Sequence, residues 1–302
     1  MHLLRLLTQV QLGIRLVKLR RHRAIRPDDT FLVSYPKSGN TWTRFLVANL
    51  RHPDQAIDFG SVDKLLPNSE VPEAWVGLRS PRIFKSHEPF QPNFPKVLYI
   101  VRDPRDVAVS EFHWCRKRNW IADDLPIHKF IQSFVRHGYG AYGSWAENVG
   151  SWIAARFGHP SFLLLRYEDM LRQPQQELAK VARFLGLAAS PDRIATAIEC
   201  SSPENMRKLE TATGERSPLT RQGRKDMFFV RSATSGSWKS QLPEESISLI
   251  ENECGGWMRW LGYVISCEQP KPTLFNTTRV CSSNVQAPVL AGLSADQPDF
   301  DR

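Results

Sequence analysis

The stretch TFLVSYPKSGNTWTRFLVANL, residues 30–50, decides the fold that this sequence predicts. Its apolar first part indicates a buried strand, a turn of small residues follows at 36–42, and a helical pattern begins at 41. A strand that turns directly into a helix points free backbone N–H groups and the positive end of the helix dipole at an anion. The segment therefore predicts an anion site formed by Lys37 and the backbone of residues 38–41, although a tight turn with a solvated lysine would give the same pattern.

The order of residues in this loop separates it from the Walker A loop of nucleotide kinases. The sequence GxxxxGK[ST] places its lysine after the second glycine and its hydroxyl on magnesium, whereas Lys37 precedes Gly39. This order disfavours kinase chemistry, and a P-loop-like nucleotide kinase is kept as an alternative interpretation.

Apolar runs and helical patterns alternate along most of the chain. The runs at 30–35, 82–87, 96–102 and 161–167 indicate four buried strands. Helices are predicted at 41–51, 104–118, 143–157, 174–186, 191–200 and 243–261. The alternation predicts an α/β fold with a mostly parallel central sheet flanked by helices, in which ligands bind beyond the carboxyl ends of the strands. We therefore expect the site to follow Tyr35, His87 and Arg102.

Composition and charge narrow the class of protein. The chain has 302 residues, 41% hydrophobic and 24% charged, which is enough for a sizeable core. Five cysteines without a CxxC pair argue against a disulfide framework or a zinc ribbon and indicate reduced thiols in a cytoplasmic protein. Seven basic residues and no acidic one lie in positions 1–26, which leaves 33 basic against 31 acidic residues in the remainder. A nucleic-acid-binding protein carries positive charge across its folded body, so we expect no nucleic-acid partner.

The two ends of the chain differ from its middle. Residues 1–27 form a basic arm in which apolar residues recur at helical spacing, and we expect an amphipathic helix packed on the domain. A helix lying on an anionic membrane, with peripheral contact through residues 1–24, is the alternative. The longest early uncharged stretch has nine residues, against about 20 for a membrane span, so no transmembrane segment is predicted. Residues 266–302 lack periodicity and contain four prolines, which predicts a flexible tail.

Five motifs in this order resemble those of the sulfotransferases that use 3'-phosphoadenosine 5'-phosphosulfate (PAPS). YPKSGNTW at 35–42 looks like the family's 5'-phosphosulfate loop, and FKSHEPF at 84–90 looks like the strand end that carries its catalytic histidine. VRDPRDVAVSEFHW at 101–114 is similar to its 3'-phosphate segment, LLLRYEDM at 163–170 to its adenine-side strand, and FFVRSATSGSWKSQL at 228–242 to its late nucleotide-closing loop. The resemblance implies the P-loop-NTPase-like sulfotransferase fold, with residues 28–265 as the sulfotransferase domain.

The resemblance also implies a role for particular residues. Arg102, Ser110 and Arg231 would contact the 3'-phosphate of PAPS. Trp42, Tyr167 and Phe229 would contact the adenosine, with Ser201 in the same nucleotide site. The phosphosulfate would lie on Lys37, Ser38, Gly39, Asn40, Thr41 and Trp42. Two alternatives stay open, namely an ion pair of Arg102 with Asp103 or Asp106, and a core position for Trp42.

Sulfuryl transfer builds negative charge on the departing phosphate oxygen, so cations and backbone N–H groups must meet that charge. We expect Lys37 first and Lys85 second in this role, and no metal ion, because no residue cluster has ligand spacing. An acceptor hydroxyl or amine also needs a base, and a neutral histidine near pH 7 suits that task. His87, at the carboxyl end of a predicted strand, is the expected base for an in-line displacement.

The sequence departs from the family pattern in the late loop. Ser232 and Ala233 stand where the family has Lys-Gly after its arginine, so one phosphate-contacting lysine is missing. Arg221, Arg224 and Lys225 are the candidates to replace it. Pro203 stands where many members have an aromatic residue. Segments 52–80 and 119–160 are expected to surround the acceptor, whether a small molecule, a lipid or a saccharide. Of their tryptophans, Trp145 and Trp152 are expected in the core. The oligomeric state stays open, and a catalytically inactive nucleotide-binding scaffold is a further alternative.

Overall fold

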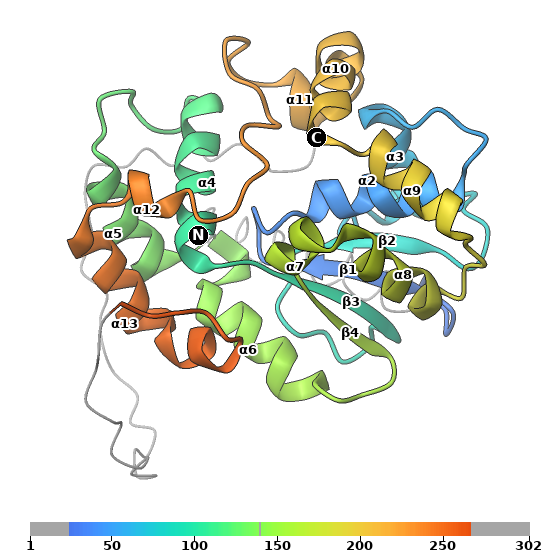
Figure 1. The fold of residues 1–302 in the computed structure, drawn as a ribbon, viewed down its shortest axis with the longest axis horizontal. Helices are drawn as coiled ribbons and strands as arrows, with labels where there is room; N and C mark the ends of the chain where they lie inside the picture. Colours follow the sequence, from blue (N-terminus) through green and yellow to red (C-terminus); the bar gives the residue numbers. More distant parts are fainter. Residues whose placement is uncertain (1–23, 139, 267–302) are drawn as a thin grey trace, which may run out of the picture. The chain divides into compact units, whose positions relative to one another are not determined.

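A computed structural model describes residues 24–266 of the chain, except residue 139. Four parallel strands form the central sheet in the order β2-β1-β3-β4. They are β1 (Thr30–Ser34), β2 (Ile83–Ser86), β3 (Lys96–Val101) and β4 (Phe162–Arg166). The four predicted strands and the α/β fold class are confirmed. Because β1 lies between β2 and β3, the segments that follow these three strands meet at one edge of the sheet (Figure 1).

The prediction that all four strands are buried is wrong for β4. Only Leu165 of its five residues is buried, and the others are partly exposed. β4 pairs with β3 alone at the edge of the described sheet, whereas β1 has a neighbour on each side and is buried throughout. Both runs are apolar, so position in the sheet, rather than local sequence, sets the difference.

Helices connect and cover the strands. All six predicted helices are confirmed to within two residues at each end: α2 (Asn40–Arg51), α4 (Pro104–Lys117), α6 (Trp145–Arg156), α8 (Pro174–Leu185), α9 (Pro191–Cys200) and α13 (Glu244–Trp260). The sequence analysis missed α3 (Phe59–Leu65), α5 (Ile127–His137), α7 (Tyr167–Arg172), α10 (Pro203–Thr213), α11 (Pro218–Arg221) and α12 (Trp238–Gln241). It also missed the short 3-10 helices η1 (Pro72–Trp75), η2 (Gly140–Tyr142) and η3 (Gly214–Arg216).

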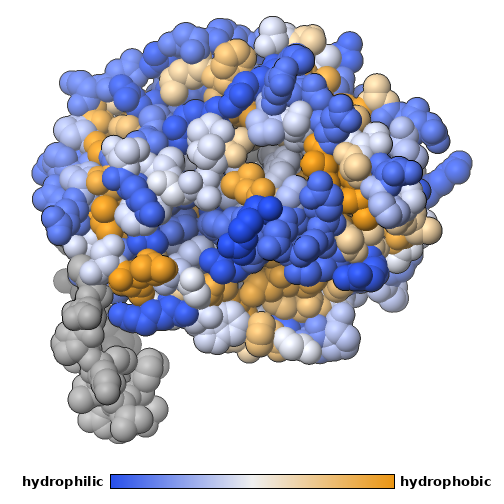
Figure 2. Space-filling model, in the orientation of Figure 1, coloured by the Kyte–Doolittle hydropathy of each residue, from blue (hydrophilic) through white to orange (hydrophobic). Residues whose placement is uncertain are grey.

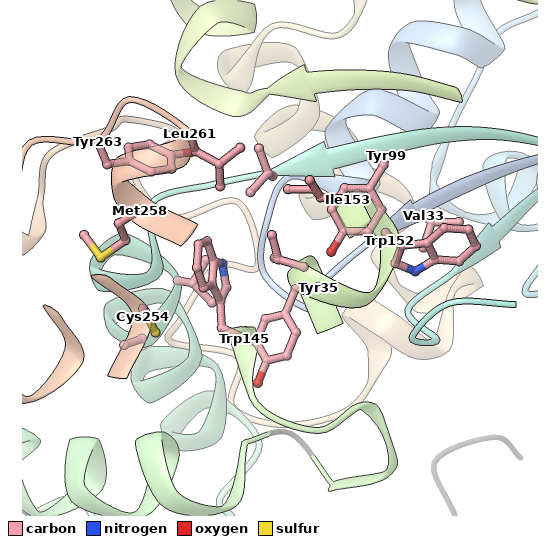
Figure 3. Close-up of a cluster of buried hydrophobic side chains, with 14 of the residues drawn as sticks. Val33, Tyr35, Tyr99, Trp145, Trp152, Ile153, Cys254, Met258, Leu261 and Tyr263 are labelled. Atoms are coloured by element: carbon pink, nitrogen blue, oxygen red, sulfur yellow. The ribbon is translucent and has the colours of Figure 1, made fainter. Parts of the chain in front are cut away.

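Alternation of side chains along the strands gives the sheet a hydrophobic cluster on each face. Phe31 and Val33 of β1 pack with residues of α4, α5, α6 and α13, while Leu32 packs with residues of α2, α3, α8 and α9. Figure 3 shows the first cluster, in which Trp145 and Trp152 are 2% and 0% exposed, so their predicted core position is confirmed. With both faces covered, the strand ends are left for a ligand.

A buried ion pair joins the amino ends of β1 and β2. The guanidinium of Arg82 donates to the two carboxylate oxygens of Asp29 at 2.8 and 2.6 Å and to the carbonyl of Ala24 at 2.7 Å. The Asp29 side chain is fully buried and that of Arg82 is 4% exposed. Removing one member of such a pair leaves an uncompensated buried charge, so the pair holds the end of the sheet opposite the predicted site.

The predicted N-terminal arm and C-terminal tail fall almost wholly on residues 1–23 and 267–302, outside the described part of the chain. The amphipathic helix, its contact with a membrane and the flexible tail therefore stay predictions. Within residues 24–266, every helix is too short or too polar to cross a bilayer. On the face drawn in Figure 2, hydrophobic residues appear in separate areas among hydrophilic ones.

Candidate active site

The loop after β1 turns sharply into α2. Lys37 and Gly39 both have left-handed backbones, with φ of 64° and 97°. A Cβ atom on residue 39 would lie 2.5 Å from Cδ2 of Tyr167, so only glycine fits under this ring. The N–H of Thr43 bonds to the Gly39 carbonyl at 3.0 Å and starts the helical pattern. The N–H groups of the preceding turn have no partner within the helix and are free to bind an anion.

Two residues of the loop donate hydrogen bonds to the strand and turn before it. The N–H of Ser38 closes the turn by donating to Tyr35 O at 3.3 Å. The amide of Asn40 donates to Leu32 O at 3.3 Å and to Ser34 Oγ at 3.2 Å, which ties the loop to β1. The Ser38 N–H is therefore engaged within the turn, while the side chain of Asn40 supports the loop from below.

Lys37 places its ammonium group between two aromatic rings. Nζ lies 4.3 Å from the ring centroid of Trp114 on α4 and 5.2 Å from that of Phe229 in the late loop. Burial lowers the pKa of Lys37 to about 8, and the charge of Glu111, also on α4, opposes the shift. At neutral pH the group is thus a partly desolvated cation, and an anion beside it would interact strongly.

Arg102 connects the phosphate loop with the late loop. Its guanidinium donates to Lys37 O at 3.1 Å and to Thr234 O at 3.0 Å, and lies 4.4 Å from the ring centroid of Tyr167. The alternative ion pair is not formed. Asp103 accepts instead from the backbone N–H of Arg105 at 2.9 Å and caps α4, as its place before Pro104 predicted.

The ring of His87 lies against the end of β1. Its Nδ1 is 2.8 Å from Ser34 O, and a carbonyl can only accept, so Nδ1 carries the proton and Nε2 has a free lone pair. Burial, followed by the charge of Lys85, lowers the pKa of His87 well below its usual value. The imidazole is therefore neutral at physiological pH.

Residues of α6 and of the segment before it hold His87 from the other side. Asn148 donates its amide to His87 O at 3.0 Å and to Tyr142 O at 3.2 Å. The phenol of Tyr99 fixes this amide by donating to Asn148 Oδ1 at 2.9 Å. The ring of Tyr142 lies 5.7 Å from that of His87, and its hydroxyl donates to Glu70 at 2.8 Å. Asn148 and Glu70 were not singled out from the sequence, whereas Tyr142 lies among the aromatic residues of 119–160 that were expected around the acceptor.

The predicted adenosine contacts gather on one side of the loop. The rings of Trp42 and Tyr167 lie 5.6 Å apart and nearly perpendicular. The indole N–H of Trp42 donates to Ser201 O at 3.1 Å, and Asn49 donates to Ser201 Oγ at 3.1 Å. Trp42 is partly exposed and packs against the rim of the second cluster, so it is not a core residue.

The late loop brings Phe229 and Arg231 to the same place. The Phe229 ring lies 5.5 Å from that of Trp114. Burial, followed by the charge of Arg102, lowers the pKa of Arg231. Ser110 is on α4, and Lys85 is in β2, where its backbone pairs with that of Pro67 and Ser69. Hydrogen bonds and ring contacts thus join Lys37, Arg102, Tyr167 and Phe229, whereas Ser110 is placed only by its position on α4.

Two of the three cations considered as substitutes for the missing lysine already have partners. Arg224 pairs with Asp123 at 2.5 Å and with Asp226 at 2.6 Å, and Lys225 pairs with Glu215. These side chains would have to leave their ion pairs to reach a ligand.

The residues present fit a polyanionic nucleotide. Ser38 Oγ and Arg102 Nε are buried and have no hydrogen-bond partner among the described residues, whereas buried polar atoms are normally paired. Both flank the loop, where Lys37 and Arg231 add positive charge. Among residues 24–266, no group of three or more His, Cys, Asp or Glu side chains is placed to hold a metal ion.

One part of the site could have been found from spacing. Glu111, Trp114 and Cys115 lie three and four residues apart, which puts them on one face of α4. All three surround the Lys37 ammonium group, and the thiol of Cys115 donates to Glu111 at 3.3 Å.

Comparisons of the sequence and of the structure with known proteins agree with one another. The family model "Sulfotransferase domain" matches residues 27–262. Sulfotransferase 1B1 of Canis lupus familiaris is 32% identical over 241 residues, which cover 71% of this chain and 78% of the dog protein. The crystal structure of mouse sulfotransferase SULT7A1 complexed with PAP is similar with a TM-score of 0.63 and 25% identity, covering 78% of this chain and 85% of that one. Retinol dehydratase in a complex with retinol and PAP has a TM-score of 0.63 at 24% identity, covering 82% and 84%.

Proposed function

Because the chain belongs to the sulfotransferase family, we propose that His87 is the base that activates the acceptor of a sulfuryl transfer. The chain is an enzyme, and its sulfuryl donor is PAPS. This assignment replaces the kinase and the inactive scaffold that the sequence left as alternatives. The observation that supports the base most strongly is the contact of His87 Nδ1 with Ser34 O at 2.8 Å.

That contact supports a particular protonation of the two ring nitrogens of His87. With Nδ1 protonated, Nε2 can take a proton from an acceptor hydroxyl or amine, and the lowered pKa keeps the ring neutral and available. The Ser34 carbonyl then stabilises the imidazolium that forms, because its oxygen accepts from Nδ1 throughout. Asn148 keeps the His87 backbone in place from the opposite side.

Lys37 and Lys85 supply the positive charge that the departing phosphate oxygen requires. When bound, PAPS brings the sulfuryl group and its own leaving group. Lys37 is the nearer of the two lysines to the phosphate loop and is already partly desolvated, so its charge is poorly screened by water. A preorganised donor of this kind contributes about 3 to 4 kcal/mol to transition-state stabilisation.

The remaining residues hold the nucleotide. Arg102, Arg231 and Ser110 would bind the 3'-phosphate, and the unpaired Nε of Arg102 is one donor available for it. Trp42, Tyr167 and Phe229 would enclose the adenosine, and Ser201 supports Trp42 through the indole hydrogen bond. Ser38, Gly39 and Thr41 complete the loop, with Asn40 anchoring it to β1.

For the acceptor, we propose a hydroxyl group on a small apolar molecule. The structures of retinol dehydratase hold retinol or androsterone beside PAP, and these ligands support that class over a saccharide. The partly exposed Tyr142 beside His87 offers a ring for such a molecule to pack against. A screen with radiolabelled PAPS against retinoids, hydroxysteroids, phenols and oligosaccharides would identify the class. Transfer to oligosaccharides alone would contradict it.

The base is tested by His87→Ala, with His159→Ala, at an exposed position in the connection before β4, as a matched control. We expect His87→Ala to lower kcat by about 10² to 10⁴. Its affinity for adenosine 3',5'-bisphosphate (PAP) should stay within about tenfold of the wild type, because His87 acts on the acceptor. His159→Ala should behave as the wild type. Near-normal turnover by His87→Ala would show that the base is another group.

A further inference from the structure

The late loop, defined here as residues 222–237 between α11 and α12, is attached to the domain along its whole length. At its beginning, the N–H of Arg224 donates to Lys117 O at 2.7 Å, and Lys117 Nζ donates to the carbonyls of Arg224, at 3.0 Å, and Met227. At its end, the Asp106 carboxylate accepts from the N–H of Gly236 at 2.6 Å and from that of Trp238 at 3.1 Å. Both Lys117 and Asp106 belong to α4, so α4 holds the two ends.

The middle of the loop is held by α10 instead. The carboxylate of Glu210 accepts from the backbone N–H groups of Phe229 at 2.6 Å and Val230 at 3.1 Å. The guanidinium of Arg207, one helical turn earlier, donates to the carbonyl of Val230 at 2.9 Å and to that of Arg231. The N–H of Arg231 bonds to Phe229 O at 3.1 Å. All six backbone polar groups of residues 229–231 are therefore paired.

These contacts are made by buried charged groups. The Glu210 side chain is 8% exposed and lies 3.9 Å from Lys117 Nζ, whose side chain is 4% exposed. Hydrogen bonds to ionised groups in such surroundings are stronger than those between neutral groups. The backbone of residues 229–231 is thus held by charged side chains of α10.

We propose that Glu210 and Arg207 are positioning residues that hold Arg231 and Phe229 in place for the 3'-phosphate end of the nucleotide before it binds. The inference rests on the proposed nucleotide site. The proposal also concerns the missing lysine. Because Ser232 and Ala233 follow Arg231, Arg231 is the residue of this loop left to contact the 3'-phosphate. A backbone that is ordered before binding lowers the entropy cost of binding the nucleotide.

The test compares two ligands that differ in the group Arg231 would bind. PAP carries a 3'-phosphate, and adenosine 5'-monophosphate does not. In Glu210→Gln, which loses charge-assisted hydrogen bonds, we expect the Kd for PAP to rise about tenfold or more. The Kd for the monophosphate should rise less, because its adenosine depends on Phe229 but it has no 3'-phosphate for Arg231 to bind. Glu204→Gln, which removes an exposed carboxylate of the same helix, should change neither value.

Two further measurements separate positioning from general destabilisation. In an Arg231→Gln background, adding Glu210→Gln should no longer alter the ratio of the two Kd values, because the residue that it positions is gone. Amide hydrogen exchange at 229–231 without nucleotide should be slow in the wild type and more than about tenfold faster in Glu210→Gln. If Glu210→Gln does not fold, Arg207→Lys serves the same comparison.

Each outcome has a distinct meaning. A wild-type protein that binds no PAP would overturn both the nucleotide site and the positioning role. Wild-type binding with an unchanged ratio in Glu210→Gln, or with equal weakening of both ligands, would overturn the positioning role alone.

Discussion

The lowered pKa of Lys37 predicts that nucleotide affinity depends on pH in a defined direction. With a pKa of about 8, roughly nine in ten Lys37 side chains are charged at about pH 7 and roughly one in ten at about pH 9. A bound anion favours the charged form and raises the pKa, so above pH 8 binding takes up a proton. The affinity for PAP is therefore highest below pH 8 and should fall about tenfold between about pH 7 and about pH 9.

Calorimetry with PAP across this range would measure the effect. The phosphates of PAP lose their second protons near a pKa of about 6, so they do not titrate in the window. His87 titrates below it and Cys115 above it, because burial lowers the pKa of the first and raises that of the second. Lys37→Arg keeps its charge and Lys37→Met has none, so both should give flat profiles, with Lys37→Met binding more weakly at about pH 7. A wild-type affinity that is constant across the range would refute the assignment of Lys37 to the phosphate site.

Three further predictions concern the loop, the base and the sheet. Gly39→Ala should abolish measurable PAP binding and lower the free energy of unfolding by about 1 to 3 kcal/mol, because the new Cβ would collide with Tyr167 and residue 39 has a left-handed backbone. A variant with the wild-type Tm and the wild-type Kd for PAP would contradict this. Asn148→Ala should lower kcat while leaving the Kd for PAP unchanged, since this amide holds the backbone of the base and not the nucleotide; equal loss of both would point to a general structural role. Asp29→Ala should lower the free energy of unfolding, measured by denaturant titration, by about 3 to 5 kcal/mol, because Arg82 is left buried without its partner. A loss under about 1 kcal/mol would show that water reaches the Arg82 guanidinium.

The parts of the fold that the sequence predicted are those set by local pattern. β1, its loop and α2 are contiguous, and their apolar periodicity and small-residue turn are visible in one short stretch. α5 carries apolar residues at 127, 130, 131 and 134 and could have been predicted in the same way. α3 and α7 have seven and six residues, which is too short for periodicity to be distinctive.

The parts of the site that the sequence could not supply depend on contacts between distant segments. Trp114 meets Lys37 across 77 positions, and Glu210 meets Phe229 only because α10 and the late loop pack together. No pattern near Asn148 marks it as the partner of His87, which is 61 residues away. Sequence motifs thus identify the residues proposed to contact a ligand, whereas the residues that support them, such as Glu210 and Asn148, are identified only from the structure.

The carboxyl end of β1 has a consequence for how the acceptor specificity of this enzyme can change. Ser34 O orients the His87 ring, and three residues later the same backbone carries Lys37. Base and donor loop are thus aligned by one rigid stretch of main chain. Of segments 52–80 and 119–160, which we expect to enclose the acceptor, the parts outside α6 are separate connections, so new acceptors can be accommodated by changing these parts without moving Asn148 and the base that it holds.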